Sequence, residues 1–362
     1  MSSYPIGMAK SDLDTPCLCL DAAALERNIE KMAAFCRARP VRARPHSKTH
    51  KCPTIAWMQM NAGAIGITCA KLGEAEVMAQ AGIRDLLIAN QILGAQKIAR
   101  LINLAAYSEV MVAVDDADNA KELSDAAEAK GLKLRAIIEV DVGMGRCGTA
   151  PGEETLALAQ QMVRLPGLRF EGIMGYEGFA VMIPDMEVRR QKAEEAMQKL
   201  LSTADLLRRK GIPVGIVSAA GTGTYHITGE IPGITELQVG SYATMDAKYK
   251  SVGADFECAL TILARVISVH GDVAIIDAGM KTMTHEFGLP PVLHPEGWTL
   301  VKLSEEHGFL QRQGGEPLRR GDLVELIPSH GCTTINLHDA YWVMRNGVLE
   351  AVWPIAARGC IR

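Results

Sequence analysis

Apolar and polar positions follow two different periodicities along the first two thirds of the chain. Short apolar, β-branched runs predict eight strands, at 41–44, 64–69, 85–89, 109–114, 134–140, 168–174, 214–218 and 235–239. Between them lie segments with helical periodicity, such as 72–81, 118–130, 154–164 and 188–209. Because helical connections make consecutive strands parallel, we predict an α/β fold with a (β/α)8 TIM-type barrel, with a doubly wound open sheet as the alternative.

The pattern changes after about residue 246. Strand-like runs at 256–270, 273–277, 298–303 and 322–327 follow one another without intervening helices, which predicts a second, mostly β C-terminal domain. A further strand-like run at 15–21 precedes the predicted helix 22–36 and could pair with this domain. We therefore predict a barrel over 22–246, and a β domain formed by 1–21 together with 247–362.

Composition narrows the class of protein. The chain has 362 residues, 48% of them hydrophobic, and a formal net charge of -4, so it can bury one or two cores and is a poor match for nucleic acid. It contains no apolar stretch long enough for a membrane span, and residues 1–10 do not resemble a secretory signal. Nine scattered cysteines show no disulfide framework. We expect a cytoplasmic protein.

Lys48 is the first candidate for chemistry, because it follows the first predicted barrel strand. A lysine amine can hold an aldehyde cofactor as a Schiff base if nearby positive charge or desolvation lowers its pKa. Four neighbours could supply that charge: Arg44, His46, His50 and Lys51. The structural alternative is a solvated basic loop.

Two further loops follow predicted barrel strands, at the end where barrel enzymes place their reactive groups. The seventh strand leads into Ser218-Ala219-Ala220-Gly221-Thr222-Gly223-Thr224, which could surround a phosphate with N–H groups and hydroxyls, or form a plain turn. The glycine-rich loop after the fifth strand presents Arg146. Arg146 could bind a phenolate oxygen or a carboxylate, or could pair structurally with Asp141 or Glu139.

The last motif lies in the predicted β domain. On an extended segment His330 and Cys332 would point to one face, and imidazole with thiolate suits zinc. Two protein ligands leave coordination positions open, as in a catalytic site. The alternative is a hydrogen-bonded histidine beside a buried cysteine. Nearby, His338 and Asp339 could be ligands, could support the ligands, or could be ordinary loop residues.

Taken together, these motifs resemble the fold type III pyridoxal-phosphate enzymes, which are alanine racemase-like, and among them the D-threonine aldolase and D-serine dehydratase family. The resemblance spans nearly the whole chain. Beyond the motifs above, it rests on Leu13-Asp14-Thr15-Pro16, Glu236-Leu237-Gln238-Val239-Gly240-Ser241-Tyr242, Asp277-Ala278-Gly279, Glu306-His307-Gly308, Asn336-Leu337-His338-Asp339 and Ala356-Ala357-Arg358-Gly359.

The resemblance implies roles for individual residues. Lys48 would carry pyridoxal 5'-phosphate, Arg146 would contact its ring oxygen, and His330 with Cys332 would bind a divalent metal. The metal would be zinc or manganese, with magnesium or cobalt as further candidates. The other cofactor-binding residues would be Tyr176, Ser218, Gly221, Thr222, Gly223 and Tyr242. The resemblance also implies a homodimer acting on a small-molecule D-3-hydroxy amino acid.

Two reactions fit such a site: aldol cleavage to glycine and an aldehyde, or dehydration to a keto acid and ammonia. Most of the motifs resemble the aldolases, but these usually have His-x-Asp at the metal, whereas His330-Gly331-Cys332 has the dehydratase form. Two further departures are Ala70 and Glu177. Glu177 could act as a base, could orient or repel a charged substrate group, or could be a solvated carboxylate at the barrel mouth.

From this resemblance we predict a lyase, with aldol cleavage favoured over dehydration. Lys48, His330 and Glu177 are its predicted catalytic residues. Racemisation is a third possible reaction. A non-catalytic pyridoxal-phosphate-binding protein is the alternative from another class.

Overall fold

The computed structural model describes residues 5–362, and the chain divides into two compact units. The barrel unit contains Lys31–Lys48, Ile55–Gly240 and Cys360–Arg362. The β unit contains the residues up to Glu30, Thr49–Thr54 and Ser241–Gly359.

Eight parallel strands form the sheet of the barrel unit, in the order β2-β9-β8-β7-β6-β5-β4-β3. A parallel bridge between His46 and Thr68, just after β2 and within β3, closes the sheet on itself. The predicted barrel is thus confirmed and the open sheet is wrong. The strands are β2 (Arg42–Ala43), β3 (Ile67–Cys69), β4 (Asp85–Ile88), β5 (Glu109–Val114), β6 (Leu134–Glu139), β7 (Leu168–Met174), β8 (Ile216–Ala219) and β9 (Glu236–Leu237).

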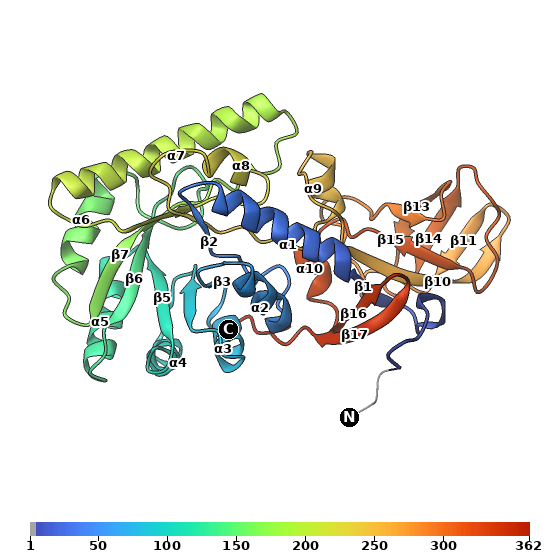
Figure 1. Ribbon diagram of the computed structural model, residues 1–362, viewed down its shortest axis with the longest axis horizontal. Helices are drawn as coiled ribbons and strands as arrows, with labels where there is room; N and C mark the ends of the chain where they lie inside the picture. The colour runs from blue at the N-terminus through green and yellow to red at the C-terminus, as the bar shows by residue number, and fades with distance from the viewer. Residues whose placement is uncertain (1–4) are drawn as a thin grey trace. The chain divides into compact units, whose positions relative to one another are not determined.

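Helices connect these strands and lie along the outside of the sheet (Figure 1). They begin where side chains cap their first N–H groups: Asp116 accepts from Asn119 N before α5, and Asp185 accepts from Val188 N before α7. The helices are α1 (Ala22–Arg37), α2 (Pro53–Asn61), α3 (Leu72–Gln80), α4 (Ala95–Ala105), α5 (Ala117–Glu128), α6 (Glu153–Met162), α7 (Met186–Arg209) and α8 (Tyr225–Thr228).

The central barrel strands are mainly apolar on both faces, because one face meets helices and the other meets the opposite strands. In β5, residues 110–114 are all buried. One cluster of buried side chains comes from four neighbouring strands: Leu87, Met111, Ala113, Ile137 and Met174. Their packing holds the strands whose carboxyl ends carry the candidate site.

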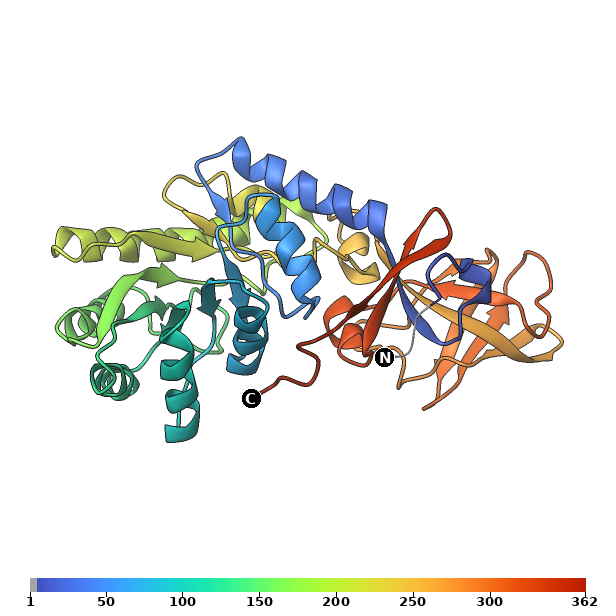
Figure 2. The same cartoon turned by 60° about the horizontal axis from the view of Figure 1, so that its bottom comes forward.

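A nine-stranded, mainly antiparallel sheet forms the β unit. The N-terminal strand β1 (Cys17–Asp21) lies inside it, antiparallel to β10 and parallel to β16, as the run at 15–21 predicted. In Figure 2 this blue segment lies among the orange and red C-terminal strands. The others are β10 (Leu260–His270), β11 (Val273–Ile276), β12 (Val292–His294), β13 (Trp298–Leu303), β14 (Gly308–Arg312), β15 (Leu323–Leu326), β16 (Ala340–Arg345) and β17 (Val348–Pro354).

Besides the part of α1 up to Glu30, the β unit contains three short helical segments: η1 (Lys10–Asp12), α9 (Ala247–Ser251) and α10 (Gly331–Ile335). Its core includes Leu13, Cys17, Cys19, Leu263, Met344 and Leu349. Over the described residues, no helix is long and apolar enough to cross a bilayer.

Candidate active site

Lys48 lies in the turn that follows β2, at the carboxyl end of the barrel strands. Its Nζ is 5.7 Å from the ring centroid of Tyr176, which follows β7. The Ser47 hydroxyl fixes the turn by donating to the Thr68 carbonyl oxygen at 3.1 Å. The alternative prediction of a solvated basic loop is wrong, because its four basic neighbours are buried. Each is at most 8% exposed: Arg44, His46, His50 and Lys51.

Arg146 belongs to the glycine-rich turn after β6. The Asp141 carboxylate shapes this turn by accepting hydrogen bonds from the N–H groups of residues 143, 144 and 145. The Arg146 guanidinium carbon lies 6.0 Å from the Tyr176 ring centroid, so Lys48 and Arg146 approach the same ring. Arg146 Nη2 also donates to Glu139 Oε1 at 3.3 Å, which is one of the predicted structural pairings. Because the Arg146 side chain is 50% exposed, the pairing still leaves N–H donors for a ligand.

The loop 220–224 connects β8 to α8 and is buried throughout. Ala220 has φ 73°, in the left-handed region, and the N–H groups of Thr224 and Tyr225 both donate to the Gly221 carbonyl oxygen. Within residues 5–362, the Gly223 N–H has no acceptor. A buried donor without an acceptor is costly in a folded protein, and it is a feature of loops that bind anions. At the end of β8, the Ser218 hydroxyl is also buried, and it accepts from Gln238 Nε2 at 3.0 Å.

Glu177 follows Tyr176 and is completely buried, so the alternative of a solvated carboxylate at the barrel mouth is wrong. Its carboxylate accepts hydrogen bonds from the hydroxyls of Thr224 and Thr228 and from the Ala220 N–H. Burial raises its pKa, and these donors oppose that shift. The carboxylate is therefore bound to the loop 220–224.

Tyr242 lies in the β unit, 2% exposed, with its ring centroid 5.6 Å from that of Phe256. Its predicted contact with the cofactor stays a prediction.

His330 and Cys332 also lie in the β unit, and the expectation of an extended segment there is wrong. Gly331 begins the short helix α10, and its N–H donates to the buried Asp246 carboxylate at 2.9 Å. His330 nonetheless hydrogen-bonds Cys332, and its Nδ1 lies 2.7 Å from Glu286 Oε1. Although burial lowers the pKa of His330, Cys332 and Glu286 together raise it to about 9. These hydrogen-bond acceptors and negative charges favour the protonated, positively charged imidazole.

The donor set is therefore an imidazole and a thiol, with a carboxylate behind the imidazole. A carboxylate on one ring nitrogen leaves the other nitrogen for a metal and fixes the ring orientation. Across the described residues, no group of three or more His, Cys, Asp and Glu side chains could hold a metal. The further candidates are engaged elsewhere: His338 Nε2 lies 2.7 Å from the Thr282 carbonyl oxygen, and Asp339 pairs with Arg358.

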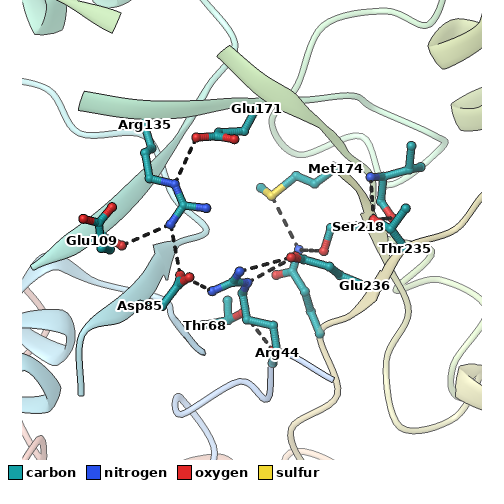
Figure 3. Close-up of polar contacts among 12 residues, drawn as sticks. Arg44, Thr68, Asp85, Glu109, Arg135, Glu171, Met174, Ser218, Thr235 and Glu236 are labelled. Carbon is teal, nitrogen blue, oxygen red and sulfur yellow. Dashed lines mark hydrogen bonds and ion pairs between the residues drawn. The ribbon is translucent and has the colours of Figure 1, made fainter. Parts of the chain in front are cut away.

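Arg44 was expected to supply positive charge near Lys48, but it lies elsewhere. Its guanidinium points toward the amino ends of the strands, where it pairs with Glu236 at 3.1 Å and with Asp85 at 2.6 Å (Figure 3). These carboxylates neutralise its charge. A cavity of about 470 Å³ lies beside this network, lined by residues at the starts of strands, among them Arg42, Asp85, Arg135 and Glu236. It therefore lies at the end of the barrel opposite Lys48.

Sequence reasoning did not find three residues that support these sites: Thr228, Arg189 and Glu286. Arg189 carried a signal, because it shares the buried face of α7 with Ala193, Ala196 and Leu200, where a charged residue needs a partner. Glu286 gave no signal in the sequence, since it is 44 residues from His330.

The residues of the barrel unit fit a pyridoxal phosphate. Lys48 offers an amine to the aldehyde, Arg146 offers guanidinium N–H groups, and the Gly223 N–H offers a buried donor to a phosphate. In the β unit, the imidazole and thiol of His330 and Cys332 match the preferences of zinc.

The sequence model of the family "Alanine racemase, N-terminal domain" matches residues 20–248. The chain belongs to this family. A model of a serine dehydratase domain matches residues 259–344. The predicted resemblance of the chain to fold type III pyridoxal-phosphate enzymes is thus confirmed.

Relatives match this racemase-like chain over almost its whole length. It is 40% identical to a D-threonine aldolase from Arthrobacter sp. (97% of this chain, 94% of the relative). It is 38% identical to a 3-hydroxy-D-aspartate aldolase from Paracoccus denitrificans (98% and 94%). The crystal structure of D-threonine aldolase from Filomicrobium marinum superposes with a TM-score of 0.96 at 36% identity, covering 99% of this chain and 100% of that one. A D-threo-3-hydroxyaspartate dehydratase from Delftia sp. is more distant, at 29% identity (91% and 93%).

Proposed function

We propose that the chain is a pyridoxal-phosphate-dependent aldolase that cleaves D-3-hydroxy amino acids to glycine and an aldehyde, with a divalent metal bound by His330 and Cys332. The observation that carries the proposal is the approach of Lys48 and Arg146 to one Tyr176 ring at the carboxyl ends of the barrel strands. Relatives named as aldolases at 38–40% identity support the choice of reaction.

Each residue has a physical task in this proposal. Lys48 would bind the cofactor aldehyde through Nζ and, when displaced by the substrate amine, would be free to carry a proton near Cα. Arg146 would donate hydrogen bonds to the ring oxygen. The loop 220–224 would hold the phosphate with backbone N–H groups. The bound cofactor withdraws electrons from the bond to Cα that breaks.

The β unit would supply the metal. His330 would bind it through Nε2, since Nδ1 is held by Glu286, and Cys332 would bind it through Sγ. Imidazole with thiolate favours zinc, whereas manganese, magnesium and cobalt are the alternatives. A cation at this pair would lower the pKa of a substrate 3-hydroxyl, which favours loss of its proton during aldol cleavage.

We also propose that the chain acts as a homodimer in the cytoplasm, with no nucleic-acid or membrane partner. All nine cysteines are free thiols, and this supports a reducing compartment.

The test is a product analysis of the purified protein, loaded with pyridoxal phosphate and zinc or manganese. A panel of D-3-hydroxy amino acids would include D-threonine, D-serine and D-3-hydroxyaspartate, with their L-enantiomers as controls. Glycine plus aldehyde from D-substrates alone is the expected result.

Dehydration is the second candidate, because His330-Gly331-Cys332 has the form typical of the dehydratases, with a cysteine where the aldolases usually have an aspartate. Keto acid and ammonia in place of glycine would establish it and reject the aldolase. Loss of optical activity without either product would indicate racemisation. Cofactor binding without any turnover would support a non-catalytic pyridoxal-phosphate-binding protein.

A further inference from the structure

The loop 220–224 is held in place by two charged side chains that are themselves buried and that come from different segments. Glu177 belongs to the turn after β7, and Arg189 lies on α7. Both have 0% exposure. Burying a charged group is unfavourable unless its hydrogen bonds are satisfied, so the partners of each indicate what it stabilises.

Glu177 fixes both ends of the loop. Its Oε2 accepts from the Ala220 N–H at 3.2 Å, and its Oε1 accepts from the Thr224 hydroxyl at 2.7 Å. A third donor, the Thr228 hydroxyl on α8, lies 2.6 Å from Oε1. Ala220 is the residue with φ 73°, so one of these hydrogen bonds stabilises the strained entry into the loop.

Arg189 holds the loop at a different point. Its Nη1 donates to the Gly223 carbonyl oxygen at 3.3 Å, and its Nε donates to the Ile183 carbonyl oxygen at 2.7 Å. Arg189 therefore ties the loop 220–224 to the neighbouring segment around residue 183. The two segments pack tightly, because a Cβ at Gly223 would lie only 2.0 Å from the Val181 carbonyl oxygen.

These bonds hold the backbone on both sides of the N–H group that a phosphate would meet. Arg189 binds the carbonyl of the peptide between Gly223 and Thr224, and the preceding peptide carries the Gly223 N–H, which has no acceptor in the part of the chain that the structure describes. Glu177 and Arg189 act on the loop through the hydrogen bonds that they make with it. Their effect is to fix the loop geometry before binding, which lowers the conformational cost of binding.

We propose that Glu177 and Arg189 are positioning residues that hold the loop 220–224 in a phosphate-binding conformation, and that Glu177 is not a reacting group. This replaces the expectation that Glu177 acts as a base. The inference rests on the proposed function, since it takes the phosphate of the cofactor as the ligand of this loop.

The test compares the dissociation constants of pyridoxal phosphate and of pyridoxal, which lacks the phosphate, by visible-absorbance titration of the apoprotein. We expect Glu177→Leu and Arg189→Met to weaken pyridoxal phosphate binding by about tenfold or more, a factor that corresponds to 1.4 kcal/mol of binding free energy. Binding of pyridoxal should stay unchanged. Glu177→Gln, which keeps one acceptor oxygen, should fall between Glu177→Leu and wild type.

A milder pair of variants covers the case in which these substitutions unfold the protein. Thr228→Val removes one donor to Glu177 from outside the loop and should weaken pyridoxal phosphate binding selectively. Thr155→Val is the matched control, because Thr155 is a buried threonine whose hydroxyl donates to the Ala150 carbonyl oxygen in another loop. It should leave both dissociation constants at their wild-type values.

The outcomes separate this inference from the proposed function. Equal weakening of both ligands, or no weakening of either, would overturn the positioning role while leaving the aldolase proposal standing. If the wild-type protein binds both ligands equally, the loop 220–224 does not bind the phosphate, and the inference is overturned as well. Normal selectivity and the expected variant effects without aldehyde production would support the inference and reject only the reaction.

Discussion

Two cations of one short segment point to opposite ends of the barrel. Arg44 lies in the ion-pair network at the amino ends of the strands, whereas Lys48, four residues later, lies 5.7 Å from the Tyr176 ring at the other end. Residue type alone therefore does not assign a role. At Arg44 two carboxylates neutralise the charge, whereas Lys48 approaches an aromatic ring that a second cation, Arg146, also approaches.

Replacing Lys48 by alanine should abolish the covalent cofactor linkage, because no other amine is assigned to the aldehyde. The measurements are the visible absorbance of the loaded protein and peptide mapping after borohydride reduction. A reduced adduct that persists in Lys48→Ala would assign the linkage to another lysine. Lys51→Ala is the matched control, since Lys51 lies in the same buried segment, and it should keep the linkage.

Replacing Cys332 by aspartate should change both the metal and the products. A carboxylate is a harder ligand than a thiolate, so we expect a shift from zinc toward manganese or magnesium, measured as metal content after competitive reconstitution. If the thiolate biases the site toward dehydration, the ratio of aldehyde to keto acid should rise. An unchanged ratio would mean that residues other than the metal ligand select the reaction.

At the scale of elements, a chain of ion pairs joins five barrel strands. Arg44 next to β2 pairs with Glu236 of β9 and Asp85 of β4 (Figure 3). Arg135 of β6 extends the chain from Asp85 to Glu171 of β7, with both contacts at 3.1 Å. Gly66 leaves room for the Arg44 guanidinium, because a Cβ at residue 66 would lie 2.2 Å from Arg44 Nη1.

Replacing Arg44 by methionine should destabilise the protein by about 3–5 kcal/mol, because it leaves the buried Glu236 without its cation. Replacing Glu236 by glutamine as well should restore part of that loss, since the unpaired buried charge is then removed. The measurement is the free energy of unfolding from urea titration monitored by circular dichroism. Lys121→Ala, which removes the exposed pair of Lys121 with Asp125, is the control. A loss in Arg44→Met no larger than the loss in Lys121→Ala would refute a structural role for the network.

Elements whose sequence pattern lies within a short segment could be predicted, and elements that depend on distant partners could not. Six of the eight barrel strands are largely apolar and lie between helical segments, so their positions could be predicted, whereas the two-residue strands β2 and β9 each pair one charged residue with one apolar residue and were found from the longer runs around them. Strands β12, β14, β16 and β17 were missed. The β16–β17 pair did carry a signal, Asn346-Gly347, and both residues have positive φ in the hairpin turn. By contrast β12 is only three residues long, and its one partner strand, β15, is remote in the sequence.

The candidate site shows the same division. Lys48, Arg146 and the loop 220–224 follow predicted strands, so strand order alone brought them to one end of the barrel. The bonds that orient them were not predictable, because Glu177 meets Thr228 across 51 residues and His330 meets Glu286 across 44. The helical turn at Gly331 also broke the assumption that His330 and Cys332 share one face of a strand.

At the scale of the whole molecule, the β unit exposes three large apolar side chains in the loop between β11 and β12. Met280, Phe287 and Leu289 are 37%, 44% and 38% exposed. The Phe287 ring also lies 4.7 Å from the His330 ring, beside the proposed metal ligands. Large exposed apolar side chains, one of them against a proposed metal ligand, are typical of surfaces that a second subunit covers.

We therefore expect the protein to sediment as a dimer, and Phe287→Arg to weaken that dimer by placing a charge in the contact. The measurement is sedimentation equilibrium over a range of protein concentrations. Val163→Arg, at an equally exposed apolar position just after α6 in the barrel unit, is the control and should remain dimeric. A wild-type monomer would reject the dimer, and a Phe287→Arg dimer of unchanged affinity would place the contact elsewhere.

The interior position of β1 has a consequence for synthesis on the ribosome. Cys17–Leu20 are buried in the finished sheet, yet Asp21 aligns with Met344, which is translated more than 300 residues later. At roughly 5–20 residues per second, the apolar β1 segment leaves the ribosome about a quarter of a minute to a minute before that neighbour exists. Lys31–Lys48 and Ile55–Gly240 of the barrel unit are translated during this interval, whereas β16 and Cys360–Arg362 follow only at the end of translation. We therefore expect the nascent chain to depend on chaperones that shield β1, and a chain that ends before β16 to leave β1 without its parallel neighbour.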